Sequence, residues 1–204
     1  MTIYLYRGDL PADLKFGDTV AVDCETMGLN PARDRLCLIQ LSAGDGEGHL
    51  VQFAAGDYYS APRLKTLLAD PGVTKLFHFA RFDIAVIRHY LELVCAPVYC
   101  TKVASRLART YTDRHGLRDL CRELLGVDLS KQHQSSDWGA DELKEEQLTY
   151  AAGDVLHLHR LRERLDAMLE REGRAELAAA CFRFLPYRAE LDLAGWVDPD
   201  IFAY

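Results

Sequence analysis

The sequence predicts an α/β domain of three layers, in which helices cover both faces of a mixed central sheet. The first half of the 204-residue chain contains short apolar or alternating segments separated by Gly, Asp, Asn and Pro, which is typical of strands. The second half contains longer segments whose apolar residues recur at helical spacing. Strands that come first, followed by helices that alternate with short strands, favour a mixed sheet.

The expected elements follow one another in a simple order. The first part of the chain predicts strands over residues 2–6, 19–24, 35–42 and 48–53, and then a helix over about 61–69. A strand at 74–79 precedes expected helices over about 81–93, 101–111 and 116–125. After a polar loop, a single long helix is expected over 144–172, because its apolar residues lie near helical spacing.

The chain divides into a main domain, residues 1–172, and a C-terminal tail, residues 173–204. The tail combines an apolar segment, AELAAACFRFL, which predicts a helix, with LDLAGWVDPDIFAY. It is too short to form a second domain. So many aromatic and aliphatic side chains need a surface to cover them, and we expect the tail to pack on the domain or on a neighbouring subunit.

Composition excludes several classes of protein. No segment is apolar enough to cross a membrane, and the start, MTIYLYRGDL, does not resemble a signal peptide, so we expect a cytoplasmic protein that does not bind membranes. The six cysteines show no metal-binding or disulfide spacing and are expected to be reduced. A net charge of −7 argues against tight binding of long nucleic acids, which usually requires a basic surface. It does not argue against a short substrate held in a local pocket.

Two carboxylates stand one residue apart in the segment VDCET, residues 22–26, which follows a β-branched apolar run. Side chains alternate along a strand, so Asp23 and Glu25 share one face and Cys24 lies on the other. Burying two like charges on one face is costly unless something neutralises them. Alternatively, the strand runs into a polar turn and both acids are solvated.

Two further motifs contain acids in apolar surroundings. The segment YAAGD places Tyr150 and Asp154 at i and i+4, so that on a helix they share one face. Such a pair is also common on helix surfaces. The segment HFARFD places Asp83 near the start of a helix, where an acid is also favoured by the helix dipole alone.

Together, these motifs predict a metal site. Clustered carboxylates cannot all stay ionised without cations, and hard oxygen ligands select Mg²⁺ or Mn²⁺. Two such ions can hold a phosphodiester for in-line attack by water. A neighbouring tyrosine hydroxyl could orient that water or accept its proton.

The order DxE, then an acid after HFARF, then YxxxD resembles the tyrosine branch of the DEDD 3′–5′ exonucleases. The histidine of the sister branch would stand at position 149, which is Thr149. The surrounding motifs resemble the ribonuclease D catalytic domain, and they are LCLIQLS (36–42), HGLRDLCRELLGVDLSKQHQSSDW (115–138) and EEQLTYAAGDVLHL (145–158). The resemblance covers about residues 15–170. It implies a ribonuclease H-like fold and makes residues 1–172 the exonuclease catalytic domain.

The resemblance also implies roles for individual residues. Asp23, Glu25 and Asp154 would bind two ions of Mg²⁺ or Mn²⁺, Asp83 would bind largely through water, and Tyr150 would position the attacking water. The implied substrate-binding residues are Thr26, Met27, Gly28, Leu29, His78, Lys131, Gln134 and Ser136. For His78, a structural hydrogen bond at the strand end is an equal alternative. Trp138 is expected to pack in the core rather than to stack on a base.

Ribonuclease D itself carries helical substrate-binding domains after the catalytic one, which this chain has no room for. The short layout and the tail resemble the nanoRNase C group, which implies hydrolysis of very short RNA, above all dinucleotides, to nucleoside 5′-monophosphates. It also implies a homo-oligomer, with an octamer as the expected form. Two alternatives remain open. One is a broader exonuclease that trims longer RNA or degrades DNA, and the other is an inactive RNA-binding protein.

Overall fold

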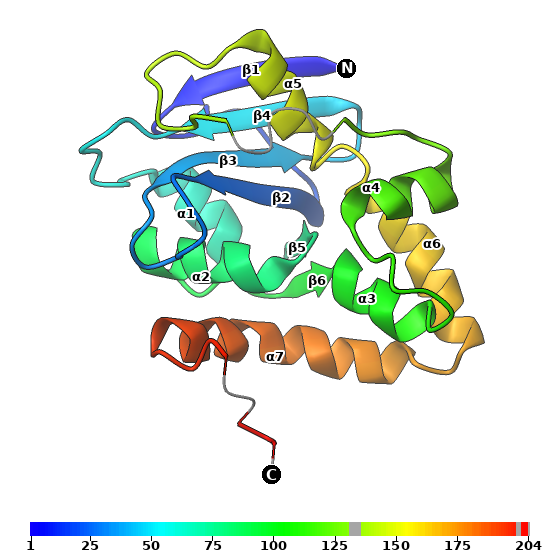
Figure 1. Ribbon diagram of the computed structural model, residues 1–204. Coiled ribbons are helices and arrows are strands. Elements are labelled where there is room, and N and C mark those ends of the chain that lie inside the picture. The colour runs from blue at the N-terminus through cyan, green and yellow to red at the C-terminus, as the bar shows by residue number, and fades with distance from the viewer. Residues whose placement is uncertain (131–135, 199–200, 204) are drawn as a thin grey trace.

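A mixed sheet forms the centre of the molecule (Figure 1). The computed structural model describes residues 1–130, 136–198 and 201–203. In these residues, the strands are β1 (Thr2–Arg7), β2 (Thr19–Thr26), β3 (Leu36–Ser42), β4 (Glu47–Gln52), β5 (Thr74–Phe77) and β6 (Val98–Cys100). They pair in the order β1-β4-β3-β2-β5-β6. The pairs of β3 with β2 and with β4 are antiparallel, and the other pairs are parallel.

Helices cover both faces of this sheet. The helical segments are α1 (Pro62–Ala69), α2 (Ala80–Tyr90), α3 (Thr101–Ala108), α4 (Leu117–Leu120), the π-helix η1 (Cys121–Leu125), α5 (Glu145–Gly153), α6 (Leu158–Arg171) and α7 (Ala175–Leu193). Ala151 and Ala152 of α5 pack with Leu38 and Leu50 of the sheet in one cluster. Residues of α1 and α2 join the larger cluster on the other face. The predicted three-layer α/β fold with a mixed sheet is therefore confirmed.

The prediction of one long helix over 144–172 is wrong, because the segment forms two helices. Helix α5 ends at Gly153 and α6 begins at Leu158. Between them, Val155 N–H bonds to the Ala152 carbonyl at 3.2 Å and Leu158 N–H bonds to the Val155 carbonyl at 3.3 Å. These bonds span three residues instead of four, so the chain tightens into turns. Gly153, a poor helix former, lies at the break.

Smaller differences concern short elements. The strand Val98–Cys100 was not expected, and three residues are too few for an alternating pattern to show. The strand expected over 74–79 ends at Phe77. It ends there because Phe79 adopts a left-handed backbone conformation with φ of 69°, from which α2 begins. The helix expected over 116–125 is α4 followed by η1.

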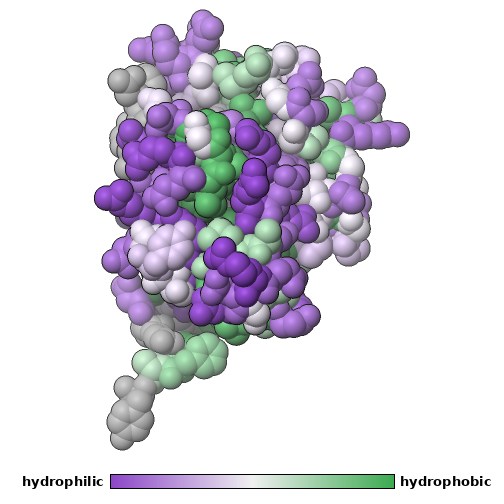
Figure 2. Space-filling model, turned by 90° about the vertical axis from the view of Figure 1, so that its right-hand side faces the viewer, coloured by the Kyte–Doolittle hydropathy of each residue, from purple (hydrophilic) through white to green (hydrophobic). Residues whose placement is uncertain are grey.

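The C-terminal helix α7 lies along α2. Arg81 of α2 forms a two-pronged ion pair with Asp192, at 2.5 and 2.7 Å, and Arg88 pairs with Glu190 at 3.1 Å. At least the helical part of the tail therefore packs on the domain, while the boundary at 172 stays a prediction. On the face shown in Figure 2, apolar residues gather in a hollow between hydrophilic side chains. Near the end of the chain, the Phe202 ring lies 6.1 Å from that of Phe184 in α7, measured between centroids. Within the described ranges, no helix has the length and apolarity needed to cross a membrane.

Candidate active site

Strand β2 presents two acids to one side of the sheet. Val20 and Val22 are fully buried and Cys24 nearly so, whereas Asp23 and Glu25 are half-buried. This alternation is the one that the sequence predicts for a strand with one acidic face. The register of β2 with β3 places Asp23 opposite Gln40, whose side-chain amide donates a hydrogen bond of 3.3 Å to Asp23. Gln40 is fully buried and was not among the predicted site residues.

Asp154 completes an acidic cluster with these two residues. It follows the last residue of α5, where the change from α5 to the turns points it at β2. One carboxylate oxygen from each of Asp23, Glu25 and Asp154 lies within 4.8 Å of the others. Tyr150, one turn earlier on α5, donates a hydrogen bond to Asp154. The i, i+4 spacing in YAAGD therefore places the phenol and the carboxylate together, as predicted.

Asp83 lies beside the cluster and is held by the backbone of β2. It is 3% exposed, and its Oδ1 accepts a hydrogen bond of 3.0 Å from the main-chain N–H of Cys24. It does not belong to the group of three acids whose oxygens lie within 4.8 Å. The structure thus brings all four predicted acids to one place, with Asp83 set behind the other three.

Burial disfavours the ionised forms of these four acids and therefore raises their pKa values. Burial raises the pKa of Glu25 to about 9, and the nearby Asp154 and Asp83 add to the shift. Burial also raises the pKa of Asp83 to about 8 and that of Asp154 to about 7, although the Tyr150 hydrogen bond opposes the shift of Asp154. The pKa of Asp23 is raised as well, by burial and then by Asp83, Asp154 and Glu25. Without cations, these groups hold protons near neutral pH.

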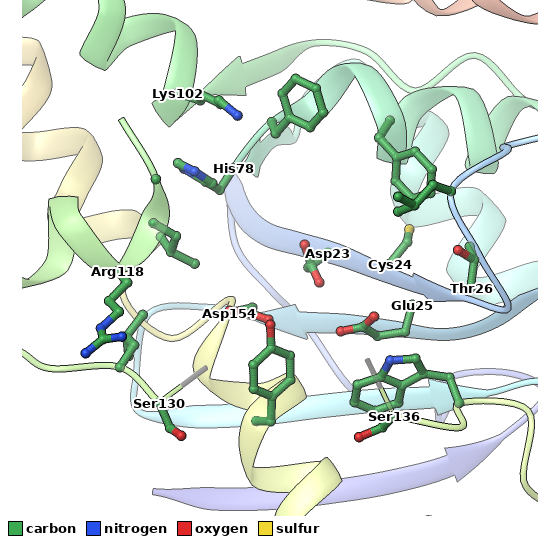
Figure 3. Close-up of a pocket in the computed structure, with 18 of the residues that line it drawn as sticks. Asp23, Cys24, Glu25, Thr26, His78, Lys102, Arg118, Ser130, Ser136 and Asp154 are labelled. Carbon is green, nitrogen blue, oxygen red and sulfur yellow. The ribbon is translucent and has the colours of Figure 1, made fainter. Parts of the chain in front are cut away.

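A cavity of about 720 Å³ opens over the cluster. Among the predicted substrate-binding residues, those that line it are Thr26, Met27, Gly28, Leu29, His78 and Ser136. Lys131 and Gln134 lie outside the described residues. Figure 3 shows the acids near the middle of the cavity, with Thr26 and Ser136 toward one end and His78, Lys102 and Arg118 toward the other.

The turn after β2 forms one end of the cavity. Thr26 donates a short hydrogen bond from its hydroxyl to the Gly28 carbonyl. A side chain at Gly28 would clash with Asp34, whose Oδ2 would lie 2.3 Å from the added Cβ. Asp34 in turn accepts a hydrogen bond of 2.9 Å from the Asn30 N–H. Glycine at 28 therefore lets the turn close tightly, and it leaves the Leu29 side chain 89% exposed at the rim.

His78 and Trp138 combine structural contacts with a place in the cavity wall. His78 Nδ1 lies 2.8 Å from the Thr101 hydroxyl, and burial, then Lys102, lowers the pKa of His78 to about 3, so the ring is neutral. Trp138 is 3% exposed and packs beside Tyr150, with ring centroids 6.1 Å apart. The prediction that Trp138 packs in the core is correct. Its indole N–H finds no partner among the described residues, although it is buried.

Several cavity residues were missed by sequence reasoning. They are Phe79, Phe82, Lys102, Arg118 and Ser130. One signal could have pointed to Lys102 and Arg118, because residues 102–122 carry six Lys or Arg and two Asp or Glu in a chain of net charge −7. This locally basic segment borders the acidic centre, which suits a phosphate-bearing ligand.

The donor set fits divalent cations. The oxygens of Asp23, Glu25 and Asp154 are hard ligands in close reach of one another, and burial raises their pKa values, so a bound cation would favour their ionised forms. Mg²⁺ and Mn²⁺ prefer such carboxylate ligands.

Comparison with known proteins agrees with this geometry. The family model described as 3′-5′ exonuclease matches residues 9–170. Ribonuclease D of Gluconacetobacter diazotrophicus is 38% identical over 161 residues, which are 79% of this chain and 40% of that protein. This chain therefore spans less than half the length of the ribonuclease D proteins that it matches.

Structures of NrnC from Brucella melitensis are similar over their whole length. The structure bound to pGG is 56% identical to this chain, with a TM-score of 0.96. The match covers 100% of this chain and 99% of the NrnC chain. The structure with bound Mg²⁺ is 55% identical, with a TM-score of 0.95, and covers 100% of both chains. The match to residues 9–170 and the similarity to NrnC agree with the DEDD order of the acids, and the chain belongs to the 3′–5′ exonuclease family.

Proposed function

We propose that the protein is a metal-dependent 3′–5′ exoribonuclease that hydrolyses very short RNA, especially dinucleotides, to nucleoside 5′-monophosphates. The observation that carries the proposal is the cluster of Asp23, Glu25 and Asp154 within 4.8 Å, with Tyr150 beside it, in a cavity that also presents Lys102 and Arg118. The similarity to NrnC, which has been solved with pGG, supports the substrate class.

In this proposal Asp23, Glu25 and Asp154 hold the ions, and Asp83 contributes through water. When bound, two Mg²⁺ or Mn²⁺ ions neutralise the acids and stabilise the attacking and leaving oxygens of an in-line displacement. Water attacks the terminal phosphodiester, the 3′ oxygen of the preceding nucleotide leaves, and a nucleoside 5′-monophosphate is released. Figure 3 shows the acids near the middle of the cavity, so ions bound to them would hold the scissile phosphate there.

Tyr150 orients the attacking water. Burial raises its pKa, and the nearby Asp154, Glu25 and Asp23 raise it further. In the metal-free protein the phenol therefore stays protonated near neutral pH, and its hydroxyl can hold the attacking water by a hydrogen bond.

The cavity suits a short substrate. Its volume of about 720 Å³ lies within the range of small-ligand pockets, about 300–1,000 Å³. The basic residues Lys102 and Arg118 lie at one end of it, where they can meet a phosphate. A short RNA has few phosphates, so local bases suffice in a chain of net charge −7.

Self-association is part of the same proposal, with an octamer as the expected form. Among the described residues, the exposed large aromatic and aliphatic side chains of α7 and the segment after it are Leu177, Phe184, Tyr187, Trp196, Val197, Ile201 and Phe202. Such a group of residues in one region is typical of an interface. Light scattering on the purified protein should give a mass of several times 23.0 kDa, and a mass of one chain would contradict self-association.

All six cysteines are free thiols, which supports a location in a reducing compartment such as the cytoplasm.

The decisive experiment measures hydrolysis of 5′-phosphorylated RNAs of two to seven nucleotides with Mg²⁺, with Mn²⁺ and with EDTA. A two-nucleotide DNA of matching sequence serves as the control for sugar preference. We expect the dinucleotide RNA to be cleaved fastest and EDTA to stop the reaction. Equal or faster cleavage of longer RNA or of DNA would favour a broader exonuclease, and no cleavage of any substrate would favour an RNA-binding protein.

A further inference from the structure

Phe79 adopts a backbone conformation that a bulky residue rarely takes. It lies between β5 and α2 with φ of 69° and ψ of 43°, in the left-handed region. Residues other than Gly, Asn and Asp are uncommon there, and a phenylalanine in this region is strained. Strain of this kind persists when the surrounding structure imposes it, and it gathers at functional sites. Phe79 is therefore a residue whose position needs a reason.

Core packing does not supply that reason. The Phe79 side chain is 46% exposed, whereas its neighbours in the chain, Phe77 and Ala80, are fully buried. The left-handed turn thus directs an aromatic ring out of the core, although a burying conformation would gain apolar contacts. The ring instead lines the cavity above the acidic cluster.

At this end of the cavity, the Lys102 side chain contacts the Phe79 ring. Its Nζ lies 4.1 Å from the centre of the Phe79 ring, a cation–π contact. Lys102 also lines the cavity, as does Arg118. An aromatic face beside a cation is the combination that proteins use to bind one base and one phosphate of a single-stranded nucleic acid.

The positions of the acids in the cavity indicate which nucleotide of the substrate lies beside Phe79 and Lys102. Figure 3 shows the acids between Thr26 on one side and His78 and Lys102 on the other. A dinucleotide whose scissile phosphate lies at the acids must extend one nucleoside toward each end. The resemblance to the DEDD 3′–5′ exonucleases implies that the turn of Thr26 to Leu29 receives the terminal nucleotide, and with that polarity the 5′ nucleotide lies toward Phe79 and Lys102.

We propose that the Phe79 ring is the stacking platform for the base of the 5′ nucleotide, the one that leaves, and so sets the preference for a substrate with two bases. This inference rests on the proposed function and names a specificity-determining residue for it. Stacking accepts any base, since every base has a π face. The left-handed backbone fixes the ring before substrate binds, which lowers the ordering cost of binding.

The test compares two 5′-phosphorylated diribonucleotides that differ at one point. One carries both bases, and the other has an abasic ribose as its 5′ residue. Their phosphates and leaving-group oxygens are the same, so only the 5′ base is removed. Steady-state kcat and KM are measured with Mg²⁺ for the wild-type protein and for four variants, Phe79→Leu, Phe79→Gly, Phe79→Tyr and Phe79→Trp.

We expect Phe79→Leu and Phe79→Gly to raise the KM for the two-base substrate about tenfold, with kcat little changed. Tyr and Trp keep an aromatic face and should keep a KM near that of the wild type. With the abasic substrate, all five proteins should share one high KM. Glycine accepts the left-handed conformation, so Phe79→Gly separates the loss of the ring from a loss of folding, which thermal denaturation checks. Tyr58→Ala, which removes a 98% exposed ring outside the cavity lining, is the control and should change nothing.

Two results would overturn the inference while the proposed function stands. In the first, the wild type cleaves the dinucleotide and Phe79→Leu has an unchanged KM for it. In the second, the variants lose the abasic substrate as much as the two-base substrate. If the wild-type protein cleaves neither substrate, the proposed function and this inference both fail.

Discussion

The main-chain N–H of Cys24 donates a hydrogen bond of 3.0 Å to Oδ1 of Asp83, across a sequence separation of 59 residues. This bond joins β2 to the first turns of α2 and fixes Asp83 behind Asp23 and Glu25. Because this donor belongs to the backbone, the hydrogen bond remains when the Cys24 side chain, which also contacts Asp83, is replaced.

The Cys24 thiol should therefore be less important than the Asp83 carboxylate. We expect Cys24→Ala to retain most of the hydrolysis of a diribonucleotide, because the main-chain donor remains. Asp83→Asn should lose about 10²-fold or more in kcat, since it removes a charge from the metal site. Steady-state assays with Mg²⁺ compare the two variants. A larger loss for Cys24→Ala than for Asp83→Asn would contradict this view of the bond.

Neutralising either of two clustered acids should abolish turnover without unfolding the protein. Asp23→Asn and Asp154→Asn each remove a proposed metal ligand but keep the shape of the side chain. We expect kcat to fall about 10²- to 10³-fold or more. The melting temperature of the metal-free protein should stay the same or rise, because the substitution removes a buried acid whose ionised form is disfavoured there. Glu176→Gln, on the exposed start of α7, is the matched control and should change neither value.

Tyr150 should contribute to the chemical step more than to binding. Tyr150→Phe keeps the ring that packs 6.1 Å from Trp138, measured between centroids, and removes only the hydroxyl. We expect kcat to fall about 10²-fold or more, with KM little changed. Measuring both constants for a diribonucleotide checks this. Unchanged kcat would remove the proposed role of Tyr150 in orienting water.

The acidic cluster should make the metal-free protein less stable as pH rises. The pKa of Glu25 is about 9 in the folded protein against 4.5 ordinarily, so the folded state holds more protons than the unfolded chain between these values. Stability present at low pH is then lost as pH rises toward 9. We expect the melting temperature in EDTA to fall from pH 6 to pH 9, and Mg²⁺ to restore more stability at pH 9 than at pH 6.

Glu25→Gln is the matched variant for this measurement, because it removes the acid whose pKa burial raises to about 9. It should flatten the dependence of melting temperature on pH in EDTA. A wild-type protein whose stability rises steadily over the same interval would show that the cluster does not hold protons as described.

The sequence predicted the parts of the site that depend on local periodicity. Alternation along β2 places Asp23 and Glu25 on one face, and the i, i+4 spacing places Tyr150 and Asp154 together. It could not predict contacts set by register and turn geometry. The pairing of Gln40 with Asp23 depends on the register of β3, and the break after Gly153 depends on tertiary packing. The meeting of Phe79 with Lys102 depends on a backbone conformation that a phenylalanine rarely adopts.

The central claim is that Asp23, Glu25 and Asp154 form the metal site that drives hydrolysis, and direct titration with Mn²⁺ tests it. Electron paramagnetic resonance counts free and bound Mn²⁺ for the wild-type protein and for Asp154→Asn, with the product nucleoside 5′-monophosphate present for both. We predict that two ions bind per wild-type chain and that the variant binds fewer or binds them far more weakly. Equal binding by the two proteins would contradict the claim, because the ions would then be held elsewhere.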